Sequence, residues 1–130
     1  FDRNLSKKHP LTFLVAEDNK INRKLLVSML GKFGYKTIHE AYDGVEAVRQ
    51  MAIERAKGQE IDVVLMDLWM PFMDGYQATE RILNGALEKA AEVGMKGFMT
   101  KPYKLLDLER LILEYCATKE MEDTSLEISL

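Results

Sequence analysis

The sequence has 130 residues, 47% of them hydrophobic, which suits one domain with a single core. Lys and Arg number 18 against 21 Asp and Glu, and a net charge of −3 argues against a nucleic-acid-binding surface. The apolar runs are too short to cross a bilayer, no secretory signal opens the chain, and Cys116 is the one cysteine. We therefore expect a cytoplasmic protein without membrane contact. The only two histidines are far apart in the sequence, which argues against a His-based zinc site.

Strand and helix patterns alternate along the first half of the chain. Short continuous apolar runs indicate strands that are covered on both faces, and apolar residues at helical spacing indicate amphipathic helices. Asn19 is suited to cap a helix, and Gly34 is suited to end it. The expected elements are a linker over 1–11, a strand over 13–16, a helix over 19–33, a strand over 35–41 and a helix from 44 toward 58.

The second half continues the alternation. It predicts a strand over 61–66, helices over 76–83 and 86–93, a strand over 97–100 and a helix over 105–115. A polar tail is expected over 118–130, frayed from residue 120. Such alternation favours an α/β fold with a doubly wound parallel sheet. We expect one folded domain over residues 12–117.

Charged side chains follow three of the expected strands. Glu17 and Asp18 follow the first, Asp67 ends the third, and Lys101 follows the last. Because the carboxyl ends of parallel strands meet at one edge, these four residues should lie together, where ligands bind in such sheets.

Three carboxylates at one edge repel one another and call for a cation. Oxygen ligands suit Mg²⁺, a nearby lysine can neutralise a phosphoryl group, and Asp67 can act as a nucleophile that forms an acyl phosphate. Each feature alone has a plainer explanation: an acidic pair compensates a helix dipole, and a strand-end aspartate forms a turn. Their occurrence at three strand ends argues against chance.

Four stretches resemble the receiver domain of two-component response regulators: LVAEDNKINRK from Leu14, AYDGVEAV from Ala41, VVLMDLWMPFMDGY from Val63 and GFMTKP from Gly97. The resemblance covers most of residues 11–117. It implies a five-stranded, flavodoxin-like fold and a phosphorelay function. Whether the chain counts as an enzyme stays open, since receivers catalyse their own phosphorylation and dephosphorylation.

The resemblance also implies site roles. Asp67 would accept the phosphoryl group from a phosphohistidine, and Lys101 would contact that group. The Mg²⁺ would be bound by Asp18, Asp67 and the backbone carbonyl of Trp69, with Glu17 acting through water. The implied switching aromatic is Phe98, and the implied cis peptide bond precedes Pro102.

A histidine-phosphotransfer protein or a histidine kinase domain is the implied partner. It would dock on the helix over 19–33, with Ile21 and Leu25 as contact residues, although either could belong to the core. Asn19 and the run Ile21-Asn22-Arg23 resemble the corresponding residues in receivers that are attached to hybrid histidine kinases. The chain would then be the cytoplasmic part of a larger sensor kinase, joined through residues 1–10.

The sequence departs from the family where a fourth strand ending in Ser or Thr is expected. Two helical patterns instead meet at Asn84-Gly85. The patterns could join in a direct turn, or residues could be missing between Leu83 and Ala86, which we favour because a lost strand leaves backbone groups unpaired. A strand donated by a neighbouring molecule is a further alternative.

Two other functions are alternatives to a phosphorelay receiver. A Mg²⁺-dependent phosphohydrolase often carries a second aspartate two residues after the nucleophile, where this chain has Trp69. A pseudo-receiver that is not phosphorylated is favoured by the absent strand and opposed by the complete set of charged residues. Nucleotide-binding glycine motifs are absent from the sequence.

Overall fold

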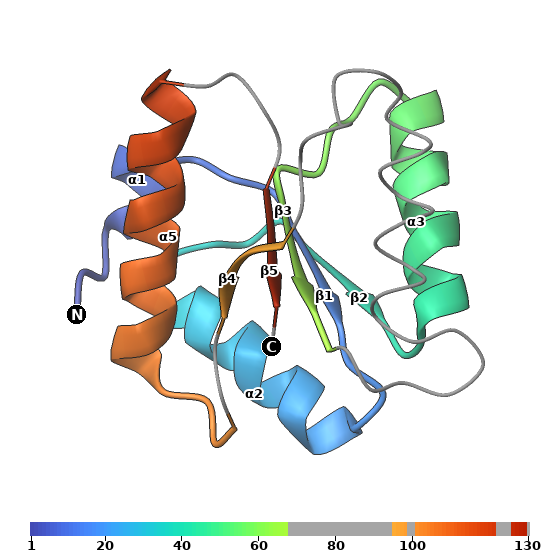
Figure 1. The fold of residues 1–130 in the computed structure, drawn as a ribbon, viewed down its shortest axis with the longest axis horizontal. Helices are drawn as coiled ribbons and strands as arrows, with labels where there is room; N and C mark the ends of the chain where they lie inside the picture. Colours follow the sequence, from blue (N-terminus) through green and yellow to red (C-terminus); the bar gives the residue numbers. More distant parts are fainter. Residues whose placement is uncertain (68–94, 99–100, 122–125, 130) are drawn as a thin grey trace.

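The computed structural model describes residues 1–67, 95–98, 101–121 and 126–129. These residues form one parallel sheet with helices on both faces (Figure 1), as the alternation predicts. The strand order is β2-β1-β3-β5-β4. The elements are α1 (Leu5–Lys8), β1 (Phe13–Ala16), α2 (Lys20–Lys32), β2 (Ile38–Ala41), α3 (Gly44–Ala56), β3 (Val63–Met66), β4 (Met95–Phe98), α5 (Leu105–Met121) and β5 (Leu126–Ser129).

The two faces of the sheet carry separate cores because neighbouring residues of a strand point to opposite sides. Phe13 and Val15 of β1 pack on the side of α1, α2 and α5. Leu14 and Ala16, the residues between and after them, pack on the side of α3. All four side chains are fully buried, which explains why the apolar run is continuous rather than alternating.

Side chains cap the two long helices of the first half of the chain, and the cap at Asn19 is the predicted one. The Asn19 side chain accepts a hydrogen bond from the backbone N–H of Asn22 at the start of α2. Asp43 does the same for Glu46 at the start of α3. Gly34 adopts a φ of 96° just after α2, a conformation that glycine tolerates best. The residue types therefore fix where α2 begins and ends and where α3 begins.

The lead-in over 1–11 is not the free linker that its polarity suggests. Residues Leu5–Lys8 form the short helix α1, and Leu5 is buried in the core with α2 and α5. The backbone N–H of Ser6 donates to the carbonyl of Phe33, and that of Asp2 donates to Glu109. Burial of Leu5 and these hydrogen bonds stabilise the docked segment, although most of its residues are polar.

The expectation of a polar tail over 118–130, frayed from residue 120, is wrong where the structure describes this segment. Helix α5 runs to Met121, past the expected domain boundary at 117, and Leu126–Ser129 form β5 inside the sheet. The strand pairs with β3 on one side and β4 on the other, so it satisfies backbone groups that would otherwise be unpaired. The alternation of Leu126 and Ile128 with polar residues is compatible with a strand, but four residues give a weak signal.

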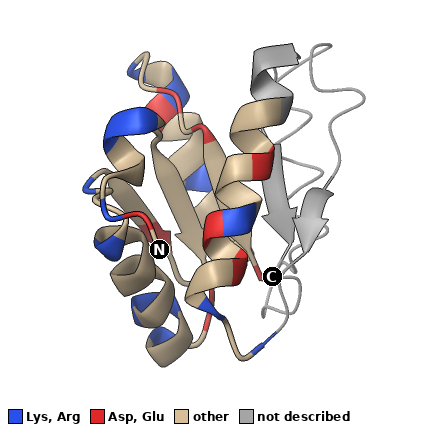
Figure 2. Cartoon of the chain, turned by 90° about the vertical axis from the view of Figure 1, so that its left-hand side faces the viewer, with Lys and Arg blue, Asp and Glu red and all other residues tan. Residues whose placement is uncertain are grey.

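Other expectations differ less from the structure. The second strand is shorter than 35–41, and the strand expected over 97–100 is β4, Met95–Phe98. The helices expected over 76–83 and 86–93 lie outside the described residues. Basic and acidic residues both occur along α5 (Figure 2). Among the described residues, no helix is long and apolar enough to span a membrane.

Candidate functional site

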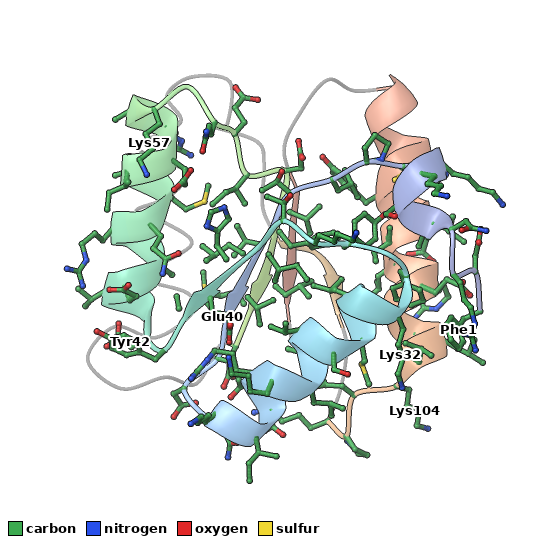
Figure 3. All side chains as sticks on the ribbon, turned by 180° about the vertical axis from the view of Figure 1, so that it is seen from behind. Phe1, Lys32, Glu40, Tyr42, Lys57 and Lys104 are labelled. Carbon is green, nitrogen blue, oxygen red and sulfur yellow. The ribbon has the colours of Figure 1, made fainter. Side chains whose placement is uncertain are left out.

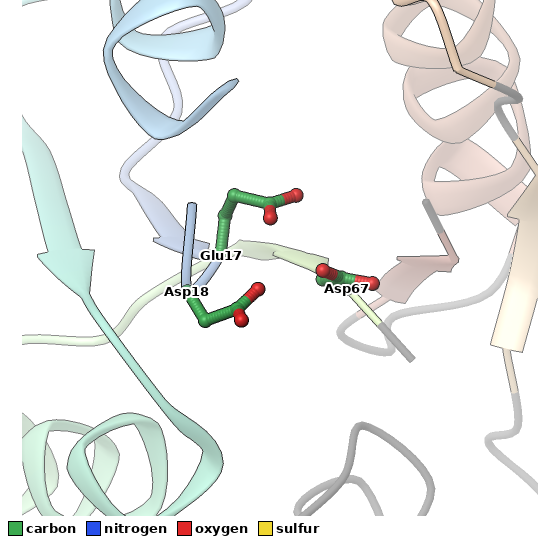
Figure 4. A group of neighbouring side chains, drawn as sticks. All are labelled: Glu17, Asp18 and Asp67. Carbon is green, nitrogen blue, oxygen red and sulfur yellow. The ribbon is translucent and has the colours of Figure 1, made fainter. Parts of the chain in front are cut away.

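The carboxylates predicted to meet at the sheet edge do meet there. Glu17 and Asp18 follow β1, and Asp67 follows β3, its backbone N–H donating to the carbonyl of Ala16. Each of the three residues offers a carboxylate oxygen, and these oxygens lie within 4.8 Å of one another (Figure 4). Glu17 and Asp67 are buried, whereas Asp18 is exposed. The cluster is therefore open to solvent on the Asp18 side.

Glu17 is held in one orientation by donors on both of its oxygens. The Tyr103 hydroxyl donates to Oε2 at 2.7 Å, and the backbone N–H of Asn19 donates to Oε1 at 3.2 Å. Burial raises the pKa of Glu17 to about 7; the Tyr103 hydrogen bond opposes this rise, and the Asp67 carboxyl adds to it. Burial and the Glu17 carboxylate also raise the pKa of Tyr103, which keeps its hydroxyl protonated as a donor.

Lys101 supplies the positive charge of the site. Its Nζ lies 3.4 Å from Asp67 Oδ2 and 3.5 Å from Glu17 Oε2, and about half of its side chain is exposed. Burial acts to lower the pKa of Lys101, but the attraction of Glu17 and Asp67 outweighs it and the pKa is raised. The lysine is therefore charged at neutral pH and faces two carboxylates at once.

Arg23 and Glu40 fasten the start of α2 to the sheet beside the site. Arg23 donates to the backbone carbonyl of Glu17 at 2.9 Å and to the Glu40 carboxylate at 3.3 Å. Lys24 also binds Glu40, at 3.0 Å. Figure 3 shows Glu40 near the end of β2, next to α2. These contacts fix the loop that carries Glu17 and Asp18.

The remaining predicted residues fall in different places. Ile21 and Leu25 are 80% and 40% exposed, so they are not core residues. The Lys101–Pro102 peptide bond is cis. Phe98 is the last residue of β4, described by its backbone, and Trp69 lies outside the described residues.

Sequence reasoning missed Tyr103 and Arg23. Tyr103 follows Lys101-Pro102 directly, and this closeness to a predicted site lysine is the one feature of the sequence that could have indicated a role in the site. Arg23 sits one turn into the helix that follows the acidic pair, which brings a basic side chain back over that loop. Neither contact is visible in the sequence itself, because each depends on how α2 and the loop after β4 pack at the edge.

The comparison with protein families agrees with this geometry. Residues 13–86 match the family described as the response regulator receiver domain, which is more than half of the chain. The chain belongs to this family. The receiver resemblance of the sequence is thereby confirmed, and so is the fold class.

Histidine kinases are among the relatives of this receiver domain. It is 31% identical over 134 residues to hybrid signal transduction histidine kinase G of Dictyostelium discoideum, covering 88% of this chain and 4% of that protein. It is also 31% identical over 121 residues to the osmosensing histidine protein kinase SLN1 of Saccharomyces cerevisiae, covering 80% of this chain and 10% of that protein. The chain thus spans a small part of the length of these relatives.

Solved receiver structures share its fold. The receiver domain of a Pseudomonas aeruginosa sensor histidine kinase, with a magnesium ion coordinated in its active site cleft, has a TM-score of 0.65 and 28% identity; the match covers 82% of this chain and 98% of that one. The chemotaxis protein CheY4 of Vibrio cholerae has a TM-score of 0.64 at 18% identity, covering 81% and 98% of the two chains, and supports the fold alone.

Proposed function

We propose that this receiver domain takes part in a phosphorelay in which Asp67 accepts a phosphoryl group from a phosphohistidine. The observation that carries the proposal is the placement of a buried carboxylate beside two further carboxylates and a lysine at one sheet edge. Phosphoryl transfer depends mainly on positioning and charge neutralisation, and this cluster supplies both.

In the transfer, an Asp67 carboxylate oxygen forms a bond to phosphorus as the phosphorus–nitrogen bond of the donor histidine breaks. The electron pair of that bond returns to the imidazole nitrogen, which takes up a proton. Lys101 Nζ, 3.4 Å from Asp67 Oδ2, is close enough to neutralise negative charge on the incoming phosphoryl oxygens. Asp67 thus acts as the nucleophile and Lys101 as the stabilising charge.

The acidic cluster fits a divalent cation because hard ions prefer carboxylate oxygens. Asp18, Asp67 and the backbone carbonyl of Trp69 would hold Mg²⁺ directly. Glu17 would act through water, in keeping with the hydrogen bonds that already engage both of its oxygens. When bound, the ion supplies positive charge that offsets repulsion between the carboxylates and the phosphoryl group.

A histidine-phosphotransfer protein or a histidine kinase domain is the proposed donor. Ile21 and Leu25 stand exposed in the first turns of α2, directly after the acidic loop. Exposed apolar side chains beside a site favour a protein partner over a small substrate. The kinase relatives support an origin in a hybrid histidine kinase. In the same proposal, Phe98 is the residue through which phosphorylation changes the surface.

The test is an intact mass spectrum taken after incubation with a small phosphodonor, with and without Mg²⁺. The expected result is one added phosphoryl group that requires Mg²⁺ and is absent from Asp67→Asn. Asp62→Asn is the control, since Asp62 lies at the opposite end of β3 and bonds the backbone of Thr12. An unchanged mass in the wild-type chain would contradict the proposal and favour a pseudo-receiver.

A further inference from the structure

A cavity of about 300 Å³ lies at the edge of the sheet opposite the acidic cluster. Its wall comes from residues that precede β1, β2 and β3 and from the last turns of α3, so it lies at the amino ends of these parallel strands. Its described lining residues are Thr12, Thr37, His39, Glu54, Gln59 and Glu60. The candidate functional site lies at the carboxyl ends of the strands, so the two places are separate.

Local structure brings the end of α3 and the strand β2 together around this cavity. Gly58, with a φ of 75°, turns the chain after α3, and the backbone N–H of Gln59 then donates to the carbonyl of Glu54 at 2.9 Å. On β2, Ile38 packs on the side of α1, α2 and α5. His39, the next residue of the strand, therefore lies on the face that α3 covers.

Glu54 is the buried charged residue of the cavity. The residue is 8% exposed. Its Oε1 lies 3.7 Å from Nζ of Lys57, a side chain that is 59% exposed at the end of α3 (Figure 3). Its Oε2 is buried and has no hydrogen-bond partner among the described residues. Because a buried carboxylate oxygen without a donor is costly, this position calls for a donor from the cavity.

The chemistry of the lining favours a cationic donor. Two carboxylates, two hydroxyls, an amide and an imidazole are all able to accept hydrogen bonds, and neither lysine nor arginine is among the described residues that line the cavity. An ammonium group donates three hydrogen bonds and accepts none, so it matches such a lining.

A metal ion fits the cavity less well than an organic cation does. Within the described part of the chain, the one set of three acidic, histidine or cysteine side chains close enough to share an ion is Glu17, Asp18 and Asp67. His39, Glu54 and Glu60 are therefore spaced too widely to hold one ion together. A molecule that carries its charge on separate groups can reach donors at such a spacing.

We propose that this cavity binds a small organic amine in its ammonium form. Glu54 is the buried acceptor, and Glu60, which is exposed, is the second carboxylate at the rim. A diamine places one ammonium group against each of them. The volume lies at the lower end of the range for small-molecule sites, which suits a ligand of this size. The inference does not depend on the function proposed for Asp67.

The test is an NMR titration of the full, isotope-labelled chain with putrescine, a linear diamine. The backbone amides of Thr37, His39 and Gln59 should shift and saturate in the millimolar range, as expected for a small probe. Butanediol, which has the same length and no charge, should leave them in place. Absence of a saturable shift at these amides, or equal shifts with butanediol, would overturn the proposal.

Substitutions identify the carboxylates that bind the probe. Glu54→Gln should weaken putrescine binding about tenfold or more, because it removes a charged acceptor. Glu60→Gln, at an exposed residue where folding is not at risk, should weaken it roughly threefold or more. Glu114→Gln makes the same change of charge at an exposed residue of α5 and should bind as the wild-type chain does. Wild-type affinity in both Glu54→Gln and Glu60→Gln would overturn the proposal.

A further variant separates this cavity from the acidic cluster. Asp67→Asn should bind putrescine with wild-type affinity, because Asp67 lies at the opposite end of β3 from the cavity. Loss of the shifts at Thr37, His39 and Gln59 in this variant would overturn the proposal and place the amine at the acidic cluster. Failure of Asp67 to accept a phosphoryl group would contradict the proposed function and leave the amine site unaffected.

Discussion

Glu17 shows how a single buried carboxylate can be held for a function at the expense of stability. Its side chain has no exposure to water, and it lies beside Asp67 with a hydrogen bond from Tyr103. Ordinary folding would favour a neutral residue here, because burying a charge is costly. Under the proposed function, the charge of Glu17 contributes when a cation and a phosphoryl group are bound.

The raised pKa predicts a pH-dependent stability for the metal-free chain. The folded state holds the Glu17 proton up to about pH 7 and the unfolded state up to about 4.5. The contribution is therefore fully present below pH 4.5 and is lost as the pH rises through 7, by on the order of 3 kcal/mol. Urea unfolding in EDTA across this range measures it. In Glu17→Gln the loss should be much smaller, and an equal loss in this variant would refute the assignment.

A second prediction concerns the Tyr103 hydroxyl. Tyr103→Phe removes a donor to Glu17 and should raise the pKa of that carboxyl further, since this hydrogen bond lowers it. We expect a loss of about 1–2 kcal/mol in the free energy of unfolding at pH 8 and a smaller loss at pH 5. Tyr42→Phe, at an exposed tyrosine, is the control. The same loss at both pH values would argue against a charged acceptor.

At the scale of elements, the helix that follows the acidic pair is positioned by its first residues. The Asn19 side chain accepts a hydrogen bond from the N–H of Asn22, and Arg23 binds the Glu17 carbonyl. The same turn exposes Ile21. One short segment therefore both orders the acidic loop and presents an apolar surface beside it.

The cap gives a stability prediction for α2. Asn19→Ala should lower the free energy of unfolding by about 1 kcal/mol, because an N–H at the helix start loses its acceptor. Asn19→Ser keeps an acceptor and should lose much less. Denaturant titration of the two variants measures the difference. Equal stability of Asn19→Ala and the wild-type chain would mean that solvent replaces the cap at no cost.

The exposed residues of α2 give a prediction about partner choice. The double variant Ile21→Ala and Leu25→Ala should slow transfer from a phosphorylated histidine-phosphotransfer protein by about tenfold or more, since apolar contact area is lost. Its reaction with a small phosphodonor should be unchanged. Ile53→Ala, at a residue of α3 that is 44% exposed, is the control. Equal slowing with both donors would place the defect in the site instead of the docking surface.

For the whole molecule, local patterns predicted the first half of the fold well. The apolar run Phe13–Ala16, the cap at Asn19 and the glycine after α2 each act through neighbouring residues, so the sequence reveals them. The meeting of Glu17, Asp18 and Asp67 also followed from the sheet rule alone. The acidic cluster and the parallel α/β fold class could therefore be predicted from the sequence.

The parts that were not predicted depend on distant contacts. Leu5 is one apolar residue in a polar lead-in, and it is buried because it packs in one core cluster with residues of α2 and α5. β5 has four residues and a weak pattern, and its place is decided by the unpaired edges of β3 and β4. The Tyr103 hydroxyl is directed by the loop after β4. Such contacts join segments that no local pattern connects.

The most direct measurement of the central claim is the location of the phosphoryl group. Borohydride reduces an acyl phosphate to an alcohol, so a phosphorylated Asp67 becomes homoserine, which peptide mass spectrometry can place in the chain. The account predicts homoserine at position 67 and at no other acidic residue, and its loss when Mg²⁺ is withheld. Homoserine at position 18, or an intact aspartate at position 67 in a chain that has gained phosphate, would contradict it.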